Sequence, residues 1–141
     1  MFQQMKKRIK NEKGLTLIEL LAVIVILAII AAIAIPAIGN IINNSKDRAI
    51  LAEASNILAG AKIAVTDNAC KATANTCSNT ELAPYFEGTL GPNDKVTWTD
   101  TNGAKTYTII YSKLGNLKNT TKYSVTSSTL TETKLVEYLE K

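Results

Sequence analysis

An unbroken apolar run near the N-terminus limits most strongly how this chain can fold. Every residue from Leu20 to Ile38 is apolar. Built as a helix, the wider segment 15–38 reaches about 36 Å at about 1.5 Å per residue, which exceeds a hydrocarbon core of about 30 Å. We therefore predict that this segment spans a membrane.

A short basic leader, residues 1–14, precedes the run. It holds five Lys or Arg residues and one Glu, whereas residues 15–141 carry eleven basic and eleven acidic side chains. The Lys/Arg cluster favours a cytoplasmic N-terminus. Because the rest of the chain is neutral overall, composition gives little support for a nucleic-acid-binding surface.

Residue types argue against an enzyme. The chain contains no histidine, which removes the commonest general base at neutral pH and the commonest metal ligand. No phosphate-binding loop or activated nucleophile is evident, so we predict no catalytic residue, no cofactor and no metal. The stretch Asp100–Gly103 resembles part of a calcium loop, but the full ligand series is missing and a hairpin turn is expected instead.

Residues 39–66 continue the helix with an amphipathic pattern. Apolar residues recur at three- and four-residue steps, as on one helix face: Ile50, Ala54, Ile57, Leu58, Ala61 and Val65. The charged residues are expected elsewhere on the helical wheel: Asp47, Glu53 and Lys62. Only Pro36 and Gly39 interrupt the preceding segment, so we predict one helix over about 15–66 with a weak point at 36–39, ending near Asn68.

The C-terminal part has the pattern of a small antiparallel sheet. Lys95–Thr99 and Thr106–Tyr111 flank an Asn-Gly step, which is a hairpin signal, and Lys122–Thr126 is predicted as a third strand. We expect the aromatic residues of these strands in the core or on a sheet face, and not as a ligand platform: Trp98, Tyr107, Tyr111 and Tyr123.

Two short helices are predicted around the sheet. Ser78–Glu81 matches a capping box inside the connecting loop 67–94. The tail 131–141 is predicted as a short helix, which Thr129 and Glu132 could cap, although a strand also suits its sequence. The single pair of cysteines, Cys70 and Cys77, is expected to form a disulfide in an oxidising place, with free thiols as the alternative.

These elements predict an α+β fold, a long N-terminal helix whose second half packs on a small antiparallel meander. Four regions follow: the leader 1–14, the membrane-spanning segment 15–38, the amphipathic half 39–66, and residues 67–141. The last two regions together are expected to form a globular head.

Glu19 distinguishes three interpretations of residues 1–38. They could be a secretory signal cut after about Ala34, an uncleaved anchor, or a segment that first anchors the chain and later packs against other helices. An acidic residue inside a membrane span costs about 2.5–3.5 kcal/mol at the centre and less near an end. A signal or passive anchor gains nothing from it, which favours the third interpretation; a surface glutamate that snorkels is the alternative.

The sequence Lys-Gly-Leu-Thr-Leu-Ile-Glu over residues 13–19, followed by an apolar helix, resembles the processing site of type IV pilins and pseudopilins. The resemblance covers about residues 6–40. It implies that prepilin peptidase cuts between Gly14 and Leu15 and that Leu15 becomes the N-methylated first residue. Glu19 is then the fifth residue, and Pro36 takes a position where many of these proteins carry proline. Leu15 departs from the more frequent Phe or Met.

The resemblance implies a structural subunit of a helical homo-oligomer, a pilus. The precursor would be a single-pass protein of the cytoplasmic membrane, with prepilin peptidase and a pilus assembly platform as partners and no nucleic acid bound by the isolated subunit. Glu19 would pair with the amine that cleavage creates at Leu15 of a neighbouring subunit. Two alternatives stay open: a pseudopilin of a type II secretion or DNA-uptake system, and a signal-anchored extracellular binding domain. Motility, adhesion and DNA uptake all stay open as roles of the filament.

Overall fold

The computed structural model describes the backbone of residues 2–71 and 73–141, and the side chains from residue 15 onward except residue 72. The chain divides into two compact units, one ending at Ile41 and the other running from Ile42 to Lys141. The first consists of helix alone, while the second contains the end of the same helix, the sheet and the shorter helices.

Helix α1 runs from Phe2 to Thr66 and includes Pro36. It begins well before the predicted start near residue 15, because the leader contains Lys, Glu and Gln, which favour helix, and no breaker. Its end lies where predicted. Asn68 has a φ of 54°, Ala69 N donates to Ala64 O and Asn68 N donates to Val65 O, which together form a Schellman motif.

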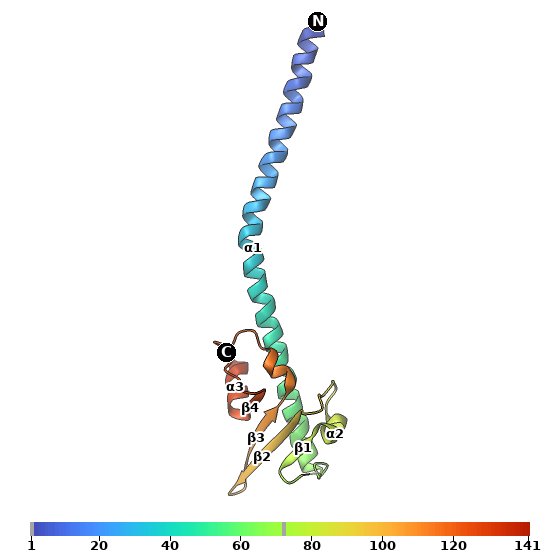
Figure 1. Ribbon diagram of the computed structural model, residues 1–141, viewed down its shortest axis with the longest axis vertical. Helices are drawn as coiled ribbons and strands as arrows, with labels where there is room; N and C mark the ends of the chain where they lie inside the picture. Colours follow the sequence, from blue (N-terminus) through green and yellow to red (C-terminus); the bar gives the residue numbers. More distant parts are fainter. Residues whose placement is uncertain (1, 72) are drawn as a thin grey trace. The chain divides into compact units, whose positions relative to one another are not determined.

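Four antiparallel strands form one sheet in the order β1-β2-β3-β4, beside the C-terminal end of α1 (Figure 1). They are β1 (Thr76–Ser78), β2 (Lys95–Thr101), β3 (Ala104–Ile110) and β4 (Thr129–Thr131). The predicted hairpin is confirmed. Asn102 and Gly103 both have positive φ, 56° and 83°, as the two central residues of a type I′ turn require.

The predicted third strand at Lys122–Thr126 is wrong, and the strand beside β3 is β4. Tyr123 is buried, with its ring 5.4 Å from that of Tyr138. Ser124 N donates to Tyr138 Oη, which in turn donates to Ser124 O. A side chain therefore satisfies backbone groups that a strand would have paired with another strand.

Short helices complete the second unit. α2 (Asn79–Leu82) begins with the predicted capping box at Ser78 and leads into the 3₁₀ turn η1 (Ala83–Tyr85). A second 3₁₀ turn, η2, spans Ser112–Asn116. The predicted C-terminal helix is confirmed as α3 (Glu132–Glu140), but its N-cap is Thr131 and not Thr129, which lies in β4.

The core lies between the end of α1 and the sheet, which confirms the α+β prediction. Six apolar side chains of α1 belong to this core: Leu51, Ala54, Ile57, Leu58, Ala61 and Ala64. The predicted stripe is therefore slightly misplaced, since Ile50 and Val65 are only half-buried. Of the strand aromatics, Tyr107 is buried beneath the helix and Trp98 is only partly covered.

Candidate functional site

The apolar part of α1 exposes its side chains on every side. Its large residues, from Leu15 to Ile42, have exposed fractions between 47% and 70%. Among the described residues, α1 is the one helix long and apolar enough to cross a membrane, judged by length and composition. This surface needs lipid or other apolar helices around it, because contiguous exposed patches of this size are rare on soluble monomers.

Glu19 is an exposed carboxylate on this apolar helix. No hydrogen bond or ion pair joins it to another described residue, so a partner for its charge must come from outside that part of the chain. Leu15 is 57% exposed and lies one turn before Glu19. The backbone at Gly14 is helical, and its surroundings lie outside the described side chains.

Pro36 lies inside α1, and the helix continues through it. A proline there has no N–H to donate to the carbonyl of Ala32. At about 1.5 Å per residue, Pro36 is roughly 25 Å along the axis from Glu19, so the two residues do not form one local site. Gly39 has nothing within 4 Å of an added Cβ, which means that packing does not require a glycine there.

A fully buried carboxylate, Asp47, fastens α1 to the loop after η2. Its Oδ1 accepts a hydrogen bond from Lys118 N and its Oδ2 accepts one from Asn119 N, both at 2.8 Å. The expectation that Asp47 lies off the buried face is therefore wrong. Asp47 lies one turn before Leu51 and two turns before Ala54, and this spacing indicates that it shares the buried face of α1.

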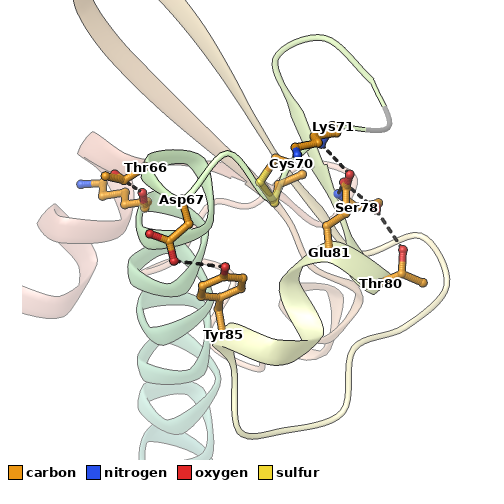
Figure 2. The surroundings of a disulfide bond; sticks show 10 residues. Thr66, Asp67, Cys70, Lys71, Ser78, Thr80, Glu81 and Tyr85 are labelled. Carbon is orange, nitrogen blue, oxygen red and sulfur yellow. Dashed lines mark hydrogen bonds between the residues drawn. A yellow bond between two sulfur atoms is a disulfide. The ribbon is translucent and has the colours of Figure 1, made fainter.

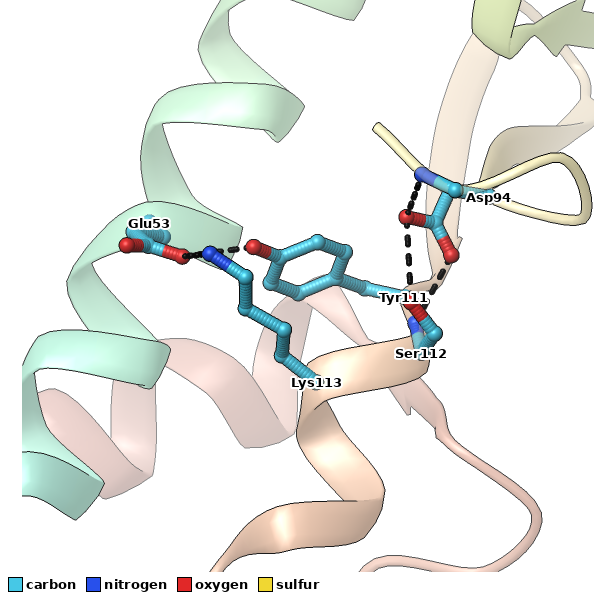
Figure 3. Close-up of polar contacts among 6 residues, drawn as sticks. Glu53, Asp94, Tyr111, Ser112 and Lys113 are labelled. Atoms are coloured by element: carbon cyan, nitrogen blue, oxygen red, sulfur yellow. Dashed lines mark hydrogen bonds and ion pairs between the residues drawn. The ribbon is translucent and has the colours of Figure 1, made fainter. Parts of the chain in front are cut away.

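A second polar contact joins α1 to η2 (Figure 3). Tyr111 Oη donates to Glu53 Oε2 at 2.5 Å, and Lys113 Nζ lies 2.9 Å from the same oxygen. The hydrogen bond from Tyr111, followed by that from Lys113, lowers the pKa of Glu53. Burial, together with the hydrogen bond to Glu53, raises the pKa of Tyr111 to about 12. The neutral phenol and the carboxylate are therefore the favoured forms.

Asp94, another buried carboxylate, links the turn before β2 to the start of η2. It accepts hydrogen bonds from Gly91 N at 2.6 Å and from Ser112 N at 2.8 Å (Figure 3). These carboxylates, Asp47 and Asp94, hold loops in place and leave no oxygen without a partner.

Cys70 and Cys77 form a disulfide that closes the loop between α1 and β1 (Figure 2). Glu81 supports the same loop, since Lys71 N donates to its Oε1 and Ser78 N donates to its Oε2. Each of these donors belongs to the residue that follows a cysteine. The loop is therefore closed both by a covalent bond and by one carboxylate.

The side chain of Asp100 accepts a hydrogen bond from the backbone of its own turn. Asp100 Oδ1 accepts a hydrogen bond from Gly103 N at 2.9 Å, as expected for a hairpin turn. Within the described residues, no three or more acidic, histidine or cysteine side chains gather as a candidate metal site.

Residues 9–35 match the family model of the prokaryotic N-terminal methylation motif. No curated protein and no solved structure matches the chain. The match covers both the Gly14–Leu15 junction and Glu19, and it ends one residue before Pro36.

Proposed function

We propose that this chain, which carries the class III signal of type IV pilins and pseudopilins, is the precursor of the structural subunit of a type IV pilus. The observation that carries the proposal is the methylation motif at the start of a helix whose apolar side chains are exposed all round. The exposed apolar segment of this helix begins at Leu15, directly after the proposed processing junction, and no described residue covers it.

Processing supplies a partner for Glu19, which forms no hydrogen bond or ion pair with another described residue. Cleavage between Gly14 and Leu15 creates an α-amine at the start of the apolar helix, and the amine keeps its positive charge after one methylation. A carboxylate in an apolar environment is costly unless a cation pairs with it. We infer that Glu19 pairs with the amine of a neighbouring subunit, which fixes the axial register of one helix against the next.

The apolar segment serves two environments in turn. In the membrane it holds the precursor in a single span, with the basic leader on the cytoplasmic side. In the filament, neighbouring apolar helices replace the lipid. Small residues along the segment, among them Ala28, Ala31 and Ala32, allow close helix approach. In this proposal Pro36 is a weak point where the helix adapts to its neighbours.

The first test determines the N-terminus of protein sheared from the cell surface. Intact mass and N-terminal sequencing should give a chain that starts at Leu15 with one added methyl group. A start near Ile35 would instead identify an ordinary secreted domain, and the proposed role of Glu19 would be wrong. Electron microscopy of the same fraction separates a pilus, which gives long filaments, from a pseudopilin, which does not.

The second test changes Glu19. Glu19→Ala should leave export and cleavage intact and reduce the amount of filament strongly, because the register contact is lost. Glu87→Ala, which removes an exposed carboxylate outside the apolar segment, is the control and should assemble at the normal level. Normal assembly of the Glu19→Ala protein would contradict the proposed pairing.

A further inference from the structure

One face of the β2–β3 hairpin is covered at the start of β2 and exposed near the turn at Asn102 and Gly103. Alternate residues of a strand share a face, and along β2 these residues change from buried Val96 to half-buried Trp98 and exposed Asp100. This face is therefore covered near Val96 and uncovered at the end of β2.

A depression of about 400 Å³ lies at this uncovered end. Trp98 and Val65 supply its apolar surface, and the disulfide loop supplies another side. On the sheet, Asp100 pairs in register with Lys105, and both line the depression. The site thus combines one partly exposed indole with polar residues from three segments of the second unit.

The polar groups of the depression have unused hydrogen-bonding capacity. No hydrogen bond or ion pair joins the side chains of Asn68, Asn75, Lys71 or Lys105 to another described residue, although all four line the site. Asp100 uses Oδ1 for Gly103 N and keeps its second oxygen available. The site therefore offers two amides, two ammonium groups and one carboxylate oxygen to a ligand.

These groups match the chemistry of a saccharide. The face of an indole ring suits the apolar C–H face of a pyranose, because aromatic rings stack on flat, weakly polar surfaces. Sugar hydroxyls both donate and accept hydrogen bonds, so they can use the amides and the carboxylate together. Two ammonium groups against one carboxylate leave a net positive charge, which favours an acidic sugar over a neutral one.

We propose that this depression, centred on Trp98, binds an acidic saccharide. A pyranose ring stacks on Trp98, its carboxylate lies between Lys71 and Lys105, and its hydroxyls bond to Asn68 and Asn75. Asp100 accepts a hydrogen bond from a sugar hydroxyl, a donor that a phosphodiester group does not offer. The sequence-based expectation that Trp98 is not part of a ligand platform is revised by this proposal, which is independent of the filament function.

Trp98 is the only tryptophan of the chain, so its fluorescence reports on this depression directly. The experiment titrates the full-length protein in detergent micelles with trigalacturonic acid, and in parallel with maltotriose as a neutral trisaccharide. Trigalacturonic acid should change the Trp98 emission in a saturable way and bind more tightly than maltotriose. The absence of a saturable change, or equal binding of the two sugars, would overturn the proposal.

Charge-matched variants locate the binding. The double variant Lys71→Gln with Lys105→Gln should weaken trigalacturonic acid about tenfold or more, since two charge-assisted contacts are lost. The control double variant Lys95→Gln with Lys134→Gln removes two exposed lysines outside the depression and should bind normally. Equal weakening in the two double variants would show diffuse electrostatic attraction and would contradict the proposal. A short oligothymidylate is titrated as well, and tighter binding of this nucleic acid than of trigalacturonic acid would also contradict the proposal.

Discussion

The two parts of helix α1 solve opposite problems with one continuous backbone. Up to Ile41, its large apolar side chains are exposed, and no described contact holds them. From Ile42 onward, the same helix buries Leu51, Ile57 and Ala61 under a sheet and fixes loops through Asp47 and Glu53. The first part of the helix needs apolar neighbours from other molecules. The second part packs against residues of its own chain.

This difference teaches where each part obtains its stability. A long apolar helix in lipid or among other helices needs little more than composition, since its backbone bonds are internal. The second unit depends on particular polar contacts, because a buried carboxylate is tolerated only when donors surround it. Substitutions in the first part should therefore alter assembly, and substitutions in the second should alter folding.

The largest expected effect follows from Asp47→Ala. The change removes the carboxylate that accepts from Lys118 N and Asn119 N, and each hydrogen bond to a charged group contributes about 1.5–3 kcal/mol. We expect the free energy of unfolding to fall by about 3 kcal/mol or more, measured by denaturant titration of the full chain in micelles with Trp98 fluorescence. Ile24→Ala should leave the same unfolding transition unchanged. A loss of similar size in the Ile24→Ala protein would contradict the distinction between the two parts of α1.

Removal of the disulfide should have the next largest effect. A double change of Cys70 and Cys77 to serine is expected to reduce stability by about 2–3 kcal/mol, since the open loop gains conformational entropy in the unfolded state. The same denaturant titration, repeated on wild-type protein with and without a reducing agent, checks the value. No effect of reduction on the wild type would show that the loop is held mainly by Glu81.

Alanine substitutions at two glycines, one in each part of α1, allow a direct comparison of the two parts. An added Cβ at Gly60 would lie 2.5 Å from the backbone O of Tyr85, so Gly60→Ala should destabilise the second unit by about 1–3 kcal/mol. Gly39→Ala meets nothing within 4 Å and should leave that unfolding transition unchanged. Comparable losses from both substitutions would mean that the two parts of α1 unfold as one unit.

The smallest expected effect concerns the Tyr111 contact and its pH dependence. Tyr111→Phe should cost about 1–2 kcal/mol at neutral pH, since a hydrogen bond to a charged group is lost. The raised pKa of Tyr111 means that its contribution is complete below the ordinary tyrosine pKa near 10 and is lost as pH rises through about 12. The lowered pKa of Glu53 adds a second loss as pH falls through the acidic range.

Stability curves between pH 3 and 12 test this assignment. Wild type should lose stability at both ends, and Tyr111→Phe should flatten the alkaline fall. A fall of equal steepness in the variant would assign the alkaline transition to other groups.

Sequence predicted the elements that local chemistry decides. Asn68 after the last helical turn, the Asn102-Gly103 step and the capping box at Ser78 each require a particular backbone geometry or hydrogen bond, and the structure has all three. The C-terminal helix was predictable for the same reason, although its cap lies at Thr131, two residues after the expected one.

The elements that sequence missed depend on distant partners. Lys122–Thr126 alternates like a strand, yet Tyr138 of α3 takes the backbone bonds of Ser124. Strands β1 and β4 have only three residues each and exist because β2 and β3 offer them edges. The burial of Asp47 could not be seen from its charge, because the donors that compensate it lie about seventy residues later in the chain.

The carboxylate of Glu81 has a consequence for how the chain matures. It accepts hydrogen bonds from Lys71 N and Ser78 N, each next to a cysteine, so it holds the two ends of the loop in addition to the disulfide (Figure 2). Such closure raises the effective concentration of one thiol around the other. With two cysteines in the chain, a single internal pairing exists. Oxidation should therefore give this one internal product quickly, and a folded chain whose disulfide is reduced should re-form the bond without unfolding.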